Sequence, residues 1–395
     1  MHSPALSFSS LALCLLHAYA TPHRPTLDIP PSNATVSISR FITANLTAVK
    51  ELHTLVQPIL PGRDTLTLPI YSFLVQHGSR KLLFDAGIRK DPLNLAPSLA
   101  TLFTNGQFSP AAMDKDIFDV LKEAGIASSS IETVIWSHLH FDHIGDMSKF
   151  PNSTSLVIGS ATDTSTYPSN PNASLLESDL AGRNVIRIDF AKSTLKINDL
   201  QAVDYFGDGS FYLVNTPGHV PGHLTALARV TANPPSFILL AGDTFHHPGQ
   251  ARPRPSLQAN FPCPAHLVAG AGKHVSTDYF FSSGSHDGAF DIQSRAEPLL
   301  RIADGADSFW ADPVVAAVSL EKVARWDAAD NVLVLIAHDL TLVANLTGLS
   351  QNSGLSGLPY HPRTLNGWKK EGWKRNTVWN FIDYEGPAWI FSPLG

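Results

Sequence analysis

The feature of this chain that most restricts its fold is a run of metal-binding side chains directly after a hydrophobic segment. Residues 131–136 (IETVIW) have the β-branched and apolar character of a buried strand, and SHLHFDH follows at once. In extended chain, alternate side chains share a side, so His138 and His140 point together, and a turn can bring Asp142 and His143 beside them. Such ligands favour a divalent cation, Zn²⁺ first, with Mn²⁺ or Fe²⁺ as alternatives.

Three further ligand-type residues each follow another apolar, strand-like run: His219, Asp243 and His338. All of them therefore stand where strands end, which is where open α/β sheets place their binding sites. Seven ligands are more than one tetrahedral ion needs. They suit two ions roughly 3.5–4 Å apart that share a carboxylate, as in two-metal hydrolytic sites.

These motifs resemble the metallo-β-lactamase superfamily over residues 45–345. Within it, TPGHVPGH at 216–223 is similar to the segment found in the N-acyl-homoserine lactonase-like branch, and FDAG at 84–87 and AHD at 337–339 resemble its matching stretches. The fold class that the resemblance implies is α/β: an αββα sandwich in a single domain, with the metals at one edge.

Carried over position by position, the resemblance implies two divalent metal ions. It assigns three side chains to the first ion, three to the second and one carboxylate to both. In that order they are His138, His140 and His219; Asp142, His143 and His338; and Asp243. His223 has no ligand counterpart in the pattern, so a supporting or structural role is favoured over metal binding.

The activity implied is hydrolysis, in which a hydroxide bridging the ions attacks a carbonyl and Asp142 passes a proton to the leaving group. Bacterial lactonases carry a tyrosine three residues after the shared aspartate. This chain has His246 there, which can donate a hydrogen bond to a developing oxyanion. A small, hydrophobic lactone is the favoured substrate, ahead of a lactam.

Two alternatives stay open. His246 also resembles the residue of phosphotriester-hydrolysing relatives, which indicates a phosphotriesterase or arylesterase-type enzyme. The other alternative is a binding protein that retains metal without turnover, although a degenerate relative is expected to have lost some of the seven ligands.

The rest of the chain is expected to divide as an N-terminal arm (21–44), the metallo-β-lactamase-like domain (45–345) and a C-terminal extension packed on it (346–395). Residues 247–312 interrupt the domain with an irregular insertion. Its aromatic residues suit either an apolar lid over the metals or simple packing on the sandwich. They are Phe261, Tyr279, Phe280, Phe281, Phe290, Phe309 and Trp310. In the basic segment 368–379, we expect the tryptophans to pack down while the lysines stay solvated.

The hydrophobic periodicity predicts alternating strands and helices. A hairpin is expected from 65–76 and 81–84, and helices from 111–125 and 313–326. Further strands are expected at 155–158, 185–190, 211–214, 224–230, 237–240 and 332–336.

The net charge of −6, from 28 Lys+Arg and 34 Asp+Glu, argues against a nucleic-acid partner. The apolar runs fall short of a membrane span, so the expected partner is a small-molecule substrate. The oligomeric state is not defined by the sequence. Cys263 is the one cysteine outside the first 20 residues, and a buried structural thiol is favoured over a reactive one.

Residues 1–20 have the apolar stretch and the final Ala-Tyr-Ala of a signal peptide, which predicts a secreted protein. Five Asn-x-Ser/Thr sequons fit a glycoprotein. They are at Asn33, Asn45, Asn152, Asn172 and Asn345.

Overall fold

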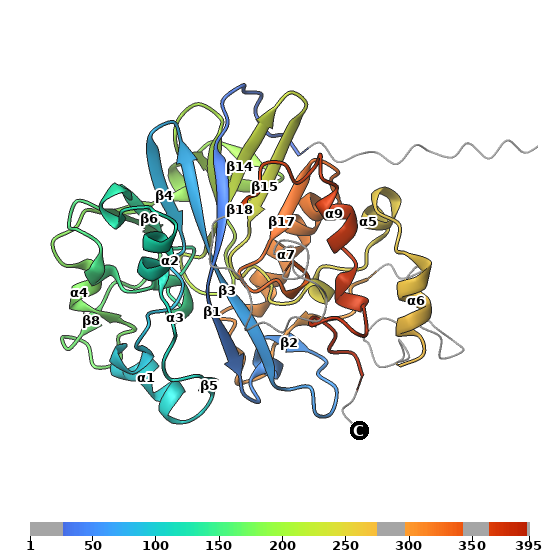
Figure 1. Ribbon diagram of the computed structural model, residues 1–395, viewed down its shortest axis with the longest axis horizontal. Coiled ribbons are helices and arrows are strands. Elements are labelled where there is room, and N and C mark those ends of the chain that lie inside the picture. Colours follow the sequence, from blue (N-terminus) through green and yellow to red (C-terminus); the bar gives the residue numbers. More distant parts are fainter. Residues whose placement is uncertain (1–26, 275–296, 343–362, 393–395) are drawn as a thin grey trace, which may run out of the picture.

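Two β-sheets lie face to face at the centre of the molecule, and helices cover both outer faces (Figure 1). The computed structural model describes residues 27–274, 297–342 and 363–392. Within them, the layers follow the order helices, sheet, sheet, helices. The predicted αββα sandwich is confirmed.

The first sheet contains eight of the described strands. From one edge to the other they are β10 (Val185–Ile188), β7 (Ser155–Gly159), β6 (Thr133–Ile135), β4 (Arg80–Phe84), β3 (Leu66–His77), β1 (Ser37–Ala48) and β18 (Arg363–Thr364), with β5 (Phe108–Ser109) paired to β1. The strands β10, β7, β6 and β4 run parallel, whereas β4, β3 and β1 are antiparallel. The predicted hairpin is β3 and β4.

The second sheet contains six described strands. In order they are β11 (Lys196–Ile197), β12 (Leu200–Asp204), β13 (Phe211–Asn215), β14 (Leu224–Ala232), β15 (Pro235–Leu240) and β17 (Val332–Leu335). Two small pairs stand apart: β16 (Arg301–Ile302) with β2 (Val56–Gln57), and β8 (Thr166–Tyr167) with β9 (Leu175–Leu176).

The helices divide between the two outer faces. Those outside the first sheet are α1 (Pro97–Thr104), α2 (Ile117–Glu123), α3 (Phe141–Ile144) and α4 (Glu177–Leu180). Those on the other side are α5 (Pro255–Asn260), α6 (Ala265–Ala271), α7 (Pro313–Ala328) and α9 (Trp373–Thr377). The predicted helix 313–326 is α7. The predicted helix 111–125 is shorter than expected, because the Asp116 carboxylate caps α2 by accepting the N–H groups of Phe118 and Asp119.

Strand periodicity builds the core. On β3, Phe73 and Val75 face the second sheet in the central cluster, whereas Ile70 and Leu74 face the helices in the outer one. Residues two positions apart on the strand therefore pack in the same core layer. The opposite outer face is closed by α7, whose Leu320 and Val323 pack on the second sheet.

The predicted N-terminal arm 21–44 is wrong from residue 37 onward. Residues 37–48 form β1, which pairs with β3 along most of its length and is largely buried. The Pro- and Ser-rich composition of residues 21–40 hid this strand. It contributes Ile38 and Ile42 to the inter-sheet core, so the sandwich begins before residue 45.

The C-terminal segment belongs to the sandwich rather than only covering it. Strand β18 extends the first sheet next to β1, and Trp368, Trp373 and Trp379 are buried as expected. Lys374 differs from the prediction, because it is buried and its Nζ donates to the carbonyls of Ala329 and Val332. No helix in the described part of the chain is long and apolar enough to cross a membrane.

Candidate metal centre

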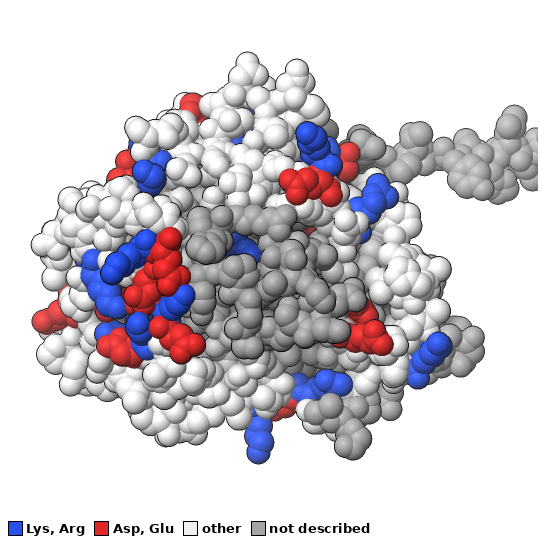
Figure 2. Space-filling model, viewed as in Figure 1, with Lys and Arg blue, Asp and Glu red and all other residues white. Residues whose placement is uncertain are grey.

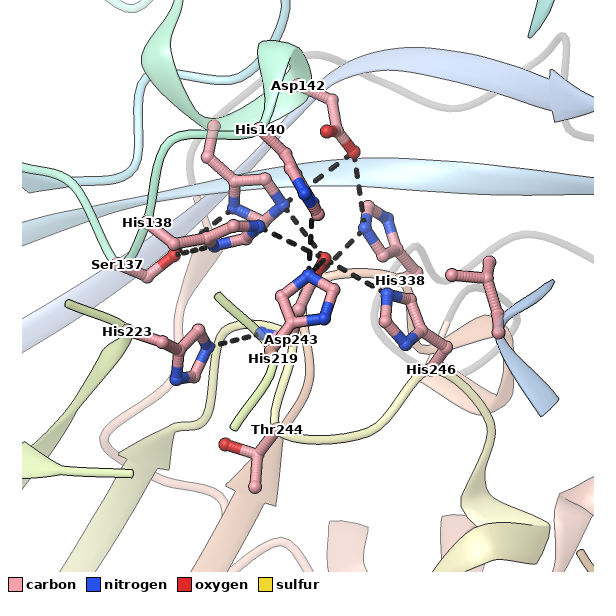
Figure 3. A network of polar contacts seen from close by, with 12 residues as sticks. Ser137, His138, His140, Asp142, His219, His223, Asp243, Thr244, His246 and His338 are labelled. Atoms are coloured by element: carbon pink, nitrogen blue, oxygen red, sulfur yellow. Dashed lines mark hydrogen bonds and ion pairs between the residues drawn. The ribbon is translucent and has the colours of Figure 1, made fainter. Parts of the chain in front are cut away.

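The structure brings all seven predicted ligands together at the edge where the strands end (Figure 3). His138 follows β6, and the short helix α3 begins just after His140 and carries Asp142 and His143. The other three side chains come from the loops after β13, β15 and β17. They are His219, Asp243 and His338.

Asp243 lies at the centre of the cluster. Its Oδ2 is 3.5 Å from Nε2 of His138, 3.5 Å from Nε2 of His219 and 3.3 Å from Nε2 of His143. Its Oδ1 is 3.4 Å from Nε2 of His338. One carboxylate thus faces side chains of both predicted sets, as a shared ligand requires.

The ligand-capable atoms fall into two compact groups, within each of which all atoms lie within 4.8 Å of one another. The first group is His138, His140, His219 and Asp243; the second is Asp142, His143 and His338. The six other side chains divide as the resemblance implies, and Asp243, expected to be shared, falls in the first group.

Unsatisfied polar atoms show that the cluster fits cations. Among the described residues, Nε2 of His138, Nε2 of His143 and Oδ1 of Asp243 are buried without a hydrogen-bond partner. Burying such atoms unpaired costs free energy, and metal coordination would remove that cost. Imidazole and carboxylate together suit Zn²⁺.

The electrostatics of the cluster also favour positive charge. Burial alone lowers the pKa of His338, but the carboxylates of Asp243 and Asp142 outweigh burial and raise it to about 10. His143 behaves in the same way, with a pKa well above its ordinary value. His138, in contrast, has a pKa far below its ordinary value because of burial and the neighbouring His143. The carboxylates thus gather positive charge onto the second group.

Outer contacts fix the orientations of three of the rings, those of His143, His138 and His338. Asp85 Oδ2 accepts a hydrogen bond from Nδ1 of His143 at 2.9 Å, and Asp85 Oδ1 accepts from the backbone N–H of Ser137 at 2.7 Å. The Ser137 hydroxyl lies 3.0 Å from Nδ1 of His138. On the other side of the cluster, Nδ1 of His338 donates to the carbonyl of Pro69 at 3.0 Å. Such contacts leave the opposite nitrogen of each ring directed into the cluster, where it could hold a metal ion.

Asp85 and Ser137 were not among the predicted site residues. The sequence did contain a signal, because Asp85 lies in the FDAG segment that resembles the lactonases. No role could be given to it, however, since its contact with His143 depends on the pairing of β4 with β6.

His223 supports the centre without belonging to either ligand group. Its Nδ1 donates to the Thr216 carbonyl at 2.9 Å, and its Nε2 accepts the backbone N–H of Asp243 at 3.1 Å. Both ring nitrogens are thus engaged by the backbone. Burial lowers the pKa of His223 to about 4, so the ring is neutral and this arrangement is stable at neutral pH.

His246 lies beside the ligands, with its Nε2 3.1 Å from Oδ2 of Asp243. Its ring stacks on that of His338, with centroids 5.9 Å apart and an angle of 10° between the planes. Its Nδ1 is buried and has no hydrogen-bond partner among the described residues. The structure therefore places His246 in direct contact with the predicted shared ligand.

The loop that carries His219 is braced by the end of the 247–312 stretch. The backbone N–H groups of Ala311 and Asp312 donate to the carbonyls of His219 and Gly218, and the Trp310 ring packs against the His219 ring at 4.7 Å. Gly218 has a φ of +124°, and a Cβ there would lie 2.1 Å from the backbone nitrogen of Ala316. Only glycine allows the loop to approach α7 this closely.

A cavity of about 240 Å³ opens onto the metal centre. His140, Asp142, Asp243, His246 and His338 form its polar end. The other walls are apolar except for Ser174. They consist of Leu46, Ala48, Leu55, Leu68, Ile70, Leu99, Leu102, Phe108, Phe141 and Phe309.

The aromatic residues predicted as a lid have different positions. Phe309 lines the cavity, Trp310 packs on His219 and His246, and Phe261 is buried in a separate core cluster with the C-terminal segment. Four predicted residues, Tyr279, Phe280, Phe281 and Phe290, lie outside the described residues. Cys263 is buried, and burial raises the pKa of its thiol to about 12, which fits the structural role.

Two stacked sheets between helices, with a His/Asp cluster where their strands end, define a metal-dependent hydrolase. The family model for the metallo-beta-lactamase superfamily matches residues 66–283. The chain belongs to the metallo-β-lactamase superfamily.

Curated relatives agree with this assignment. The metallo-hydrolase mfmC of Annulohypoxylon moriforme is 38% identical over 92% of this chain and 91% of its own length. The gamma-lactamase FDB1 of Fusarium pseudograminearum is 34% identical over 90% of this chain and 84% of its own. The N-acyl homoserine lactonase AttM of Agrobacterium fabrum is 30% identical over 46% and 67%, respectively.

One relative is much longer than this chain. The cytochrome P450 monooxygenase mpaDE of Penicillium roqueforti is 37% identical over 90% of this chain, but the match spans only 38% of the length of mpaDE.

Proposed function

We propose that the protein opens a small, hydrophobic lactone, and that it requires two divalent metal ions, with Zn²⁺ favoured. The cavity carries this proposal, because apolar walls enclose a space of about 240 Å³ that ends at the ligand cluster. A pocket of this kind selects an uncharged, compact molecule and holds its polar group at the metals. The relation to a lactonase supports the lactone over other cyclic acyl compounds.

The ions, when bound, supply Lewis acidity and lower the pKa of bound water toward neutrality. The side chains of the protein position the substrate and transfer the proton. Asp142 lines the cavity, and its Oδ2 lies 3.3 Å from Nε2 of His338. From there the Asp142 carboxylate can accept the proton that the attacking water loses and pass it to the leaving alkoxide.

His246 is the second catalytic residue that we propose. It lines the cavity at its polar end, at the position where the bacterial lactonases have a tyrosine. We expect it to stabilise the charge that develops on the carbonyl oxygen of the substrate.

The test is hydrolysis of a panel of lactones, lactams, esters and phosphotriesters by the zinc-loaded protein. We expect acid release from hydrophobic lactones, abolished by a chelator and in His138→Ala. His266→Ala is the matched control, because His266 is an exposed histidine outside the centre. Zinc-replete, folded protein that is inactive on the whole panel would contradict the proposal and favour a metal-retaining binding protein.

A lactam is the second candidate substrate, and the relation to the gamma-lactamase FDB1 favours it. Lactams and lactones of equal ring size and substitution should be compared in the same assay. A higher kcat/KM for the lactam would show that a lactam, and not a lactone, is the preferred substrate. Faster turnover of paraoxon-like triesters would instead select the phosphotriesterase-type alternative that His246 suggests.

We further propose that the protein is exported and glycosylated. Asn33, Asn152 and Asn172 are exposed, whereas Asn45 is half-buried on β1 opposite Pro69. Asn345 lies outside the described residues. Glycans are therefore expected at the three exposed sites and not at Asn45. Mass spectrometry of the protein secreted by its native host tests this, and a mature chain that begins at Thr21 is expected.

A further inference from the structure

The loop that carries His338 is held by one short stretch of β3. Pro69 accepts a hydrogen bond from Nδ1 of His338 itself, at 3.0 Å. Tyr71 binds the residues on either side: its backbone N–H donates to the Ala337 carbonyl at 3.3 Å, and its hydroxyl donates to the Asp339 carbonyl at 2.8 Å. Two residues of β3 thus contact three successive residues of the loop.

Tyr71 is suited to a fixed role. Its side chain is 1% exposed and belongs to the core between the sheets, and the Arg40 guanidinium lies 5.1 Å from its ring centroid. The neighbouring Ile70 points to the opposite face of the strand, where it lines the substrate cavity. The same part of β3 therefore serves the cavity on one face and the ligand loop on the other.

The other restraints on this loop are few among the described residues. Ala337 donates its N–H to the Gly242 carbonyl at 3.1 Å, which links the loop to the one carrying Asp243. After His338, the carboxylate of Asp339 accepts from the N–H and the hydroxyl of Thr341, at 2.9 and 2.5 Å. Two side-chain contacts therefore join the loop to β3, the His338 ring to the Pro69 carbonyl and the Tyr71 hydroxyl to the Asp339 carbonyl, and of these only the Tyr71 hydroxyl can be removed without changing a candidate ligand.

We propose that Tyr71 is a positioning residue for the second metal ion, which it serves by holding the His338 loop at the correct distance from Asp142 and Asp243. Residues that orient metal ligands through such outer contacts change metal affinity roughly 10–100-fold when they are removed. His138, His140 and His219 lie on other loops, so the first ion should not depend on Tyr71. The two ions are part of the proposed function, but their retention can be measured without any substrate.

The experiment is equilibrium dialysis of the full chain against buffered free Zn²⁺, with the bound metal counted by mass spectrometry. The wild type is expected to hold two ions. In Tyr71→Phe, the apparent dissociation constant of the second ion should rise roughly tenfold while that of the first is unchanged. The Co²⁺-loaded protein should show the same loss in its electronic spectrum, with only the bands of the second site reduced.

Tyr212→Phe is the matched control. Tyr212 is equally buried on β13, and its hydroxyl has no hydrogen-bond partner among the described residues, so its removal should leave both ions in place. In His338→Ala, where the second ion is already weakened, adding Tyr71→Phe should cause no further change in ion retention.

If Tyr71→Phe does not fold, Thr341→Val tests the same loop instead, because it removes the hydrogen bond from the Thr341 hydroxyl to the Asp339 carboxylate. It should weaken the second ion and leave the first in place. Equal weakening of both ions, or no change in either while thermal unfolding of the metal-free protein shifts, would show that Tyr71 is only structural and would overturn the proposal.

Discussion

Carboxylates and imidazoles at the centre are arranged in two tiers. Asp243 faces four imidazoles through its Oδ2, among them His246 at 3.1 Å, and is the inner residue. Asp85 stands behind His143, whose Nδ1 donates a hydrogen bond to Asp85 Oδ2. Its φ of +59° is unusual for a residue other than glycine, which indicates that the local fold holds it in place against strain.

Asp85→Asn tests this outer tier. The amide can still accept the hydrogen bond from His143, but it lacks the charge that helps the ring act as a ligand. We expect the second ion to bind roughly tenfold more weakly, measured by zinc competition with a chromophoric chelator. Asp163→Asn, at an exposed aspartate that binds only its own turn, should change nothing. Unchanged zinc affinity in Asp85→Asn would show that the charge is unimportant.

His223→Ala tests the assignment of His223 as a supporting residue. It leaves the N–H of Asp243 and the carbonyl of Thr216 without a partner and opens a cavity, which costs on the order of 3 kcal/mol of unfolding free energy. Two ions should still bind. Denaturant unfolding and metal analysis measure the two effects, with exposed His266→Ala as control. Loss of one ion without loss of stability would make His223 a ligand.

The clustering of the seven candidate ligands could be predicted from the sequence, whereas the residues that support them could not. Each candidate ligand follows an apolar run within a few residues, so local spacing is enough to indicate it. Tyr71 and Asp85 act through contacts between strands far apart in the chain, with 268 residues separating Tyr71 from Asp339. Such contacts depend on sheet register, which local patterns do not specify.

At the scale of elements, strands with clean hydrophobic patterns were predicted well and those with mixed composition were not. Strands β13, β15 and β17 and helix α7 lie within a few residues of their predicted positions. Strand β1 was missed because Ser, Thr and Asn alternate with its apolar residues, which is typical of a surface segment. In the structure, Thr43 satisfies its hydroxyl by donating to the Ile70 carbonyl, so a polar strand can lie inside the sandwich.

The segment from β16 to α7 forms part of the cavity wall, and Phe309 is its contact with the substrate space. Phe309→Ala should enlarge the cavity, lowering kcat/KM for small lactones and raising it for bulkier ones. We expect the ratio of kcat/KM for bulky lactones to kcat/KM for small lactones to rise roughly tenfold. Apolar pockets discriminate between substrates by about 1–3 kcal/mol per methylene-sized change. Phe118→Ala removes a ring from α2 outside the cavity and should leave the ratio unchanged. The same kcat/KM ratio in both variants would show that Phe309 does not contact the substrate.

Helix α9 is tied to the second sheet by a buried lysine, which gives the fold a pH dependence. Burial lowers the pKa of Lys374 to about 7, and Asp327 opposes this shift only in part. Between pH 7 and about 10, the unfolded chain therefore holds a proton that the folded chain lacks, and stability rises with pH. Below pH 7 both states are protonated, and the contribution no longer changes.

Lys374→Met should remove this dependence. The unfolding free energy of the wild type relative to the variant should increase by on the order of 2 kcal/mol from pH 7 to pH 9, because each pKa unit corresponds to about 1.4 kcal/mol. Urea unfolding at several pH values and one zinc concentration measures it. Lys370→Met changes an exposed lysine in the same segment, and its unfolding free energy should vary with pH as that of the wild type does. A constant difference between Lys374→Met and the wild type would mean that Lys374 titrates normally.

At the scale of the whole molecule, charges of both signs are mixed on the surface, and the buried His and Asp side chains of the candidate metal centre gather at one edge of the sandwich. The face shown in Figure 2 carries acidic and basic side chains side by side. Ion pairs among the described residues include Lys90–Asp119 and Lys115–Glu123. Such exposed pairs contribute little to stability. The buried carboxylates and imidazoles at the metal centre have larger consequences, because they bring together loops from both sheets.

Metal binding should therefore stabilise the entire sandwich. The ligands come from loops after β6, β13, β15 and β17, so the ions can bind tightly only when both sheets are in place. Ligands that bind only the folded state stabilise it by about 2.7 kcal/mol at 100 times their dissociation constant, and the effect grows with their concentration. Stability should thus rise with free Zn²⁺ and fall in a chelator.

Calorimetric unfolding across a series of buffered zinc concentrations measures this linkage. We expect the unfolding temperature of the wild type to increase with the logarithm of free Zn²⁺, and that of His338→Ala to increase with a smaller slope, since one ion remains well held. Cys263→Ala should behave as the wild type, because its buried thiol belongs to neither candidate ligand group. A zinc-independent unfolding temperature in the wild type would mean that the clustered side chains do not take up ions in the folded protein.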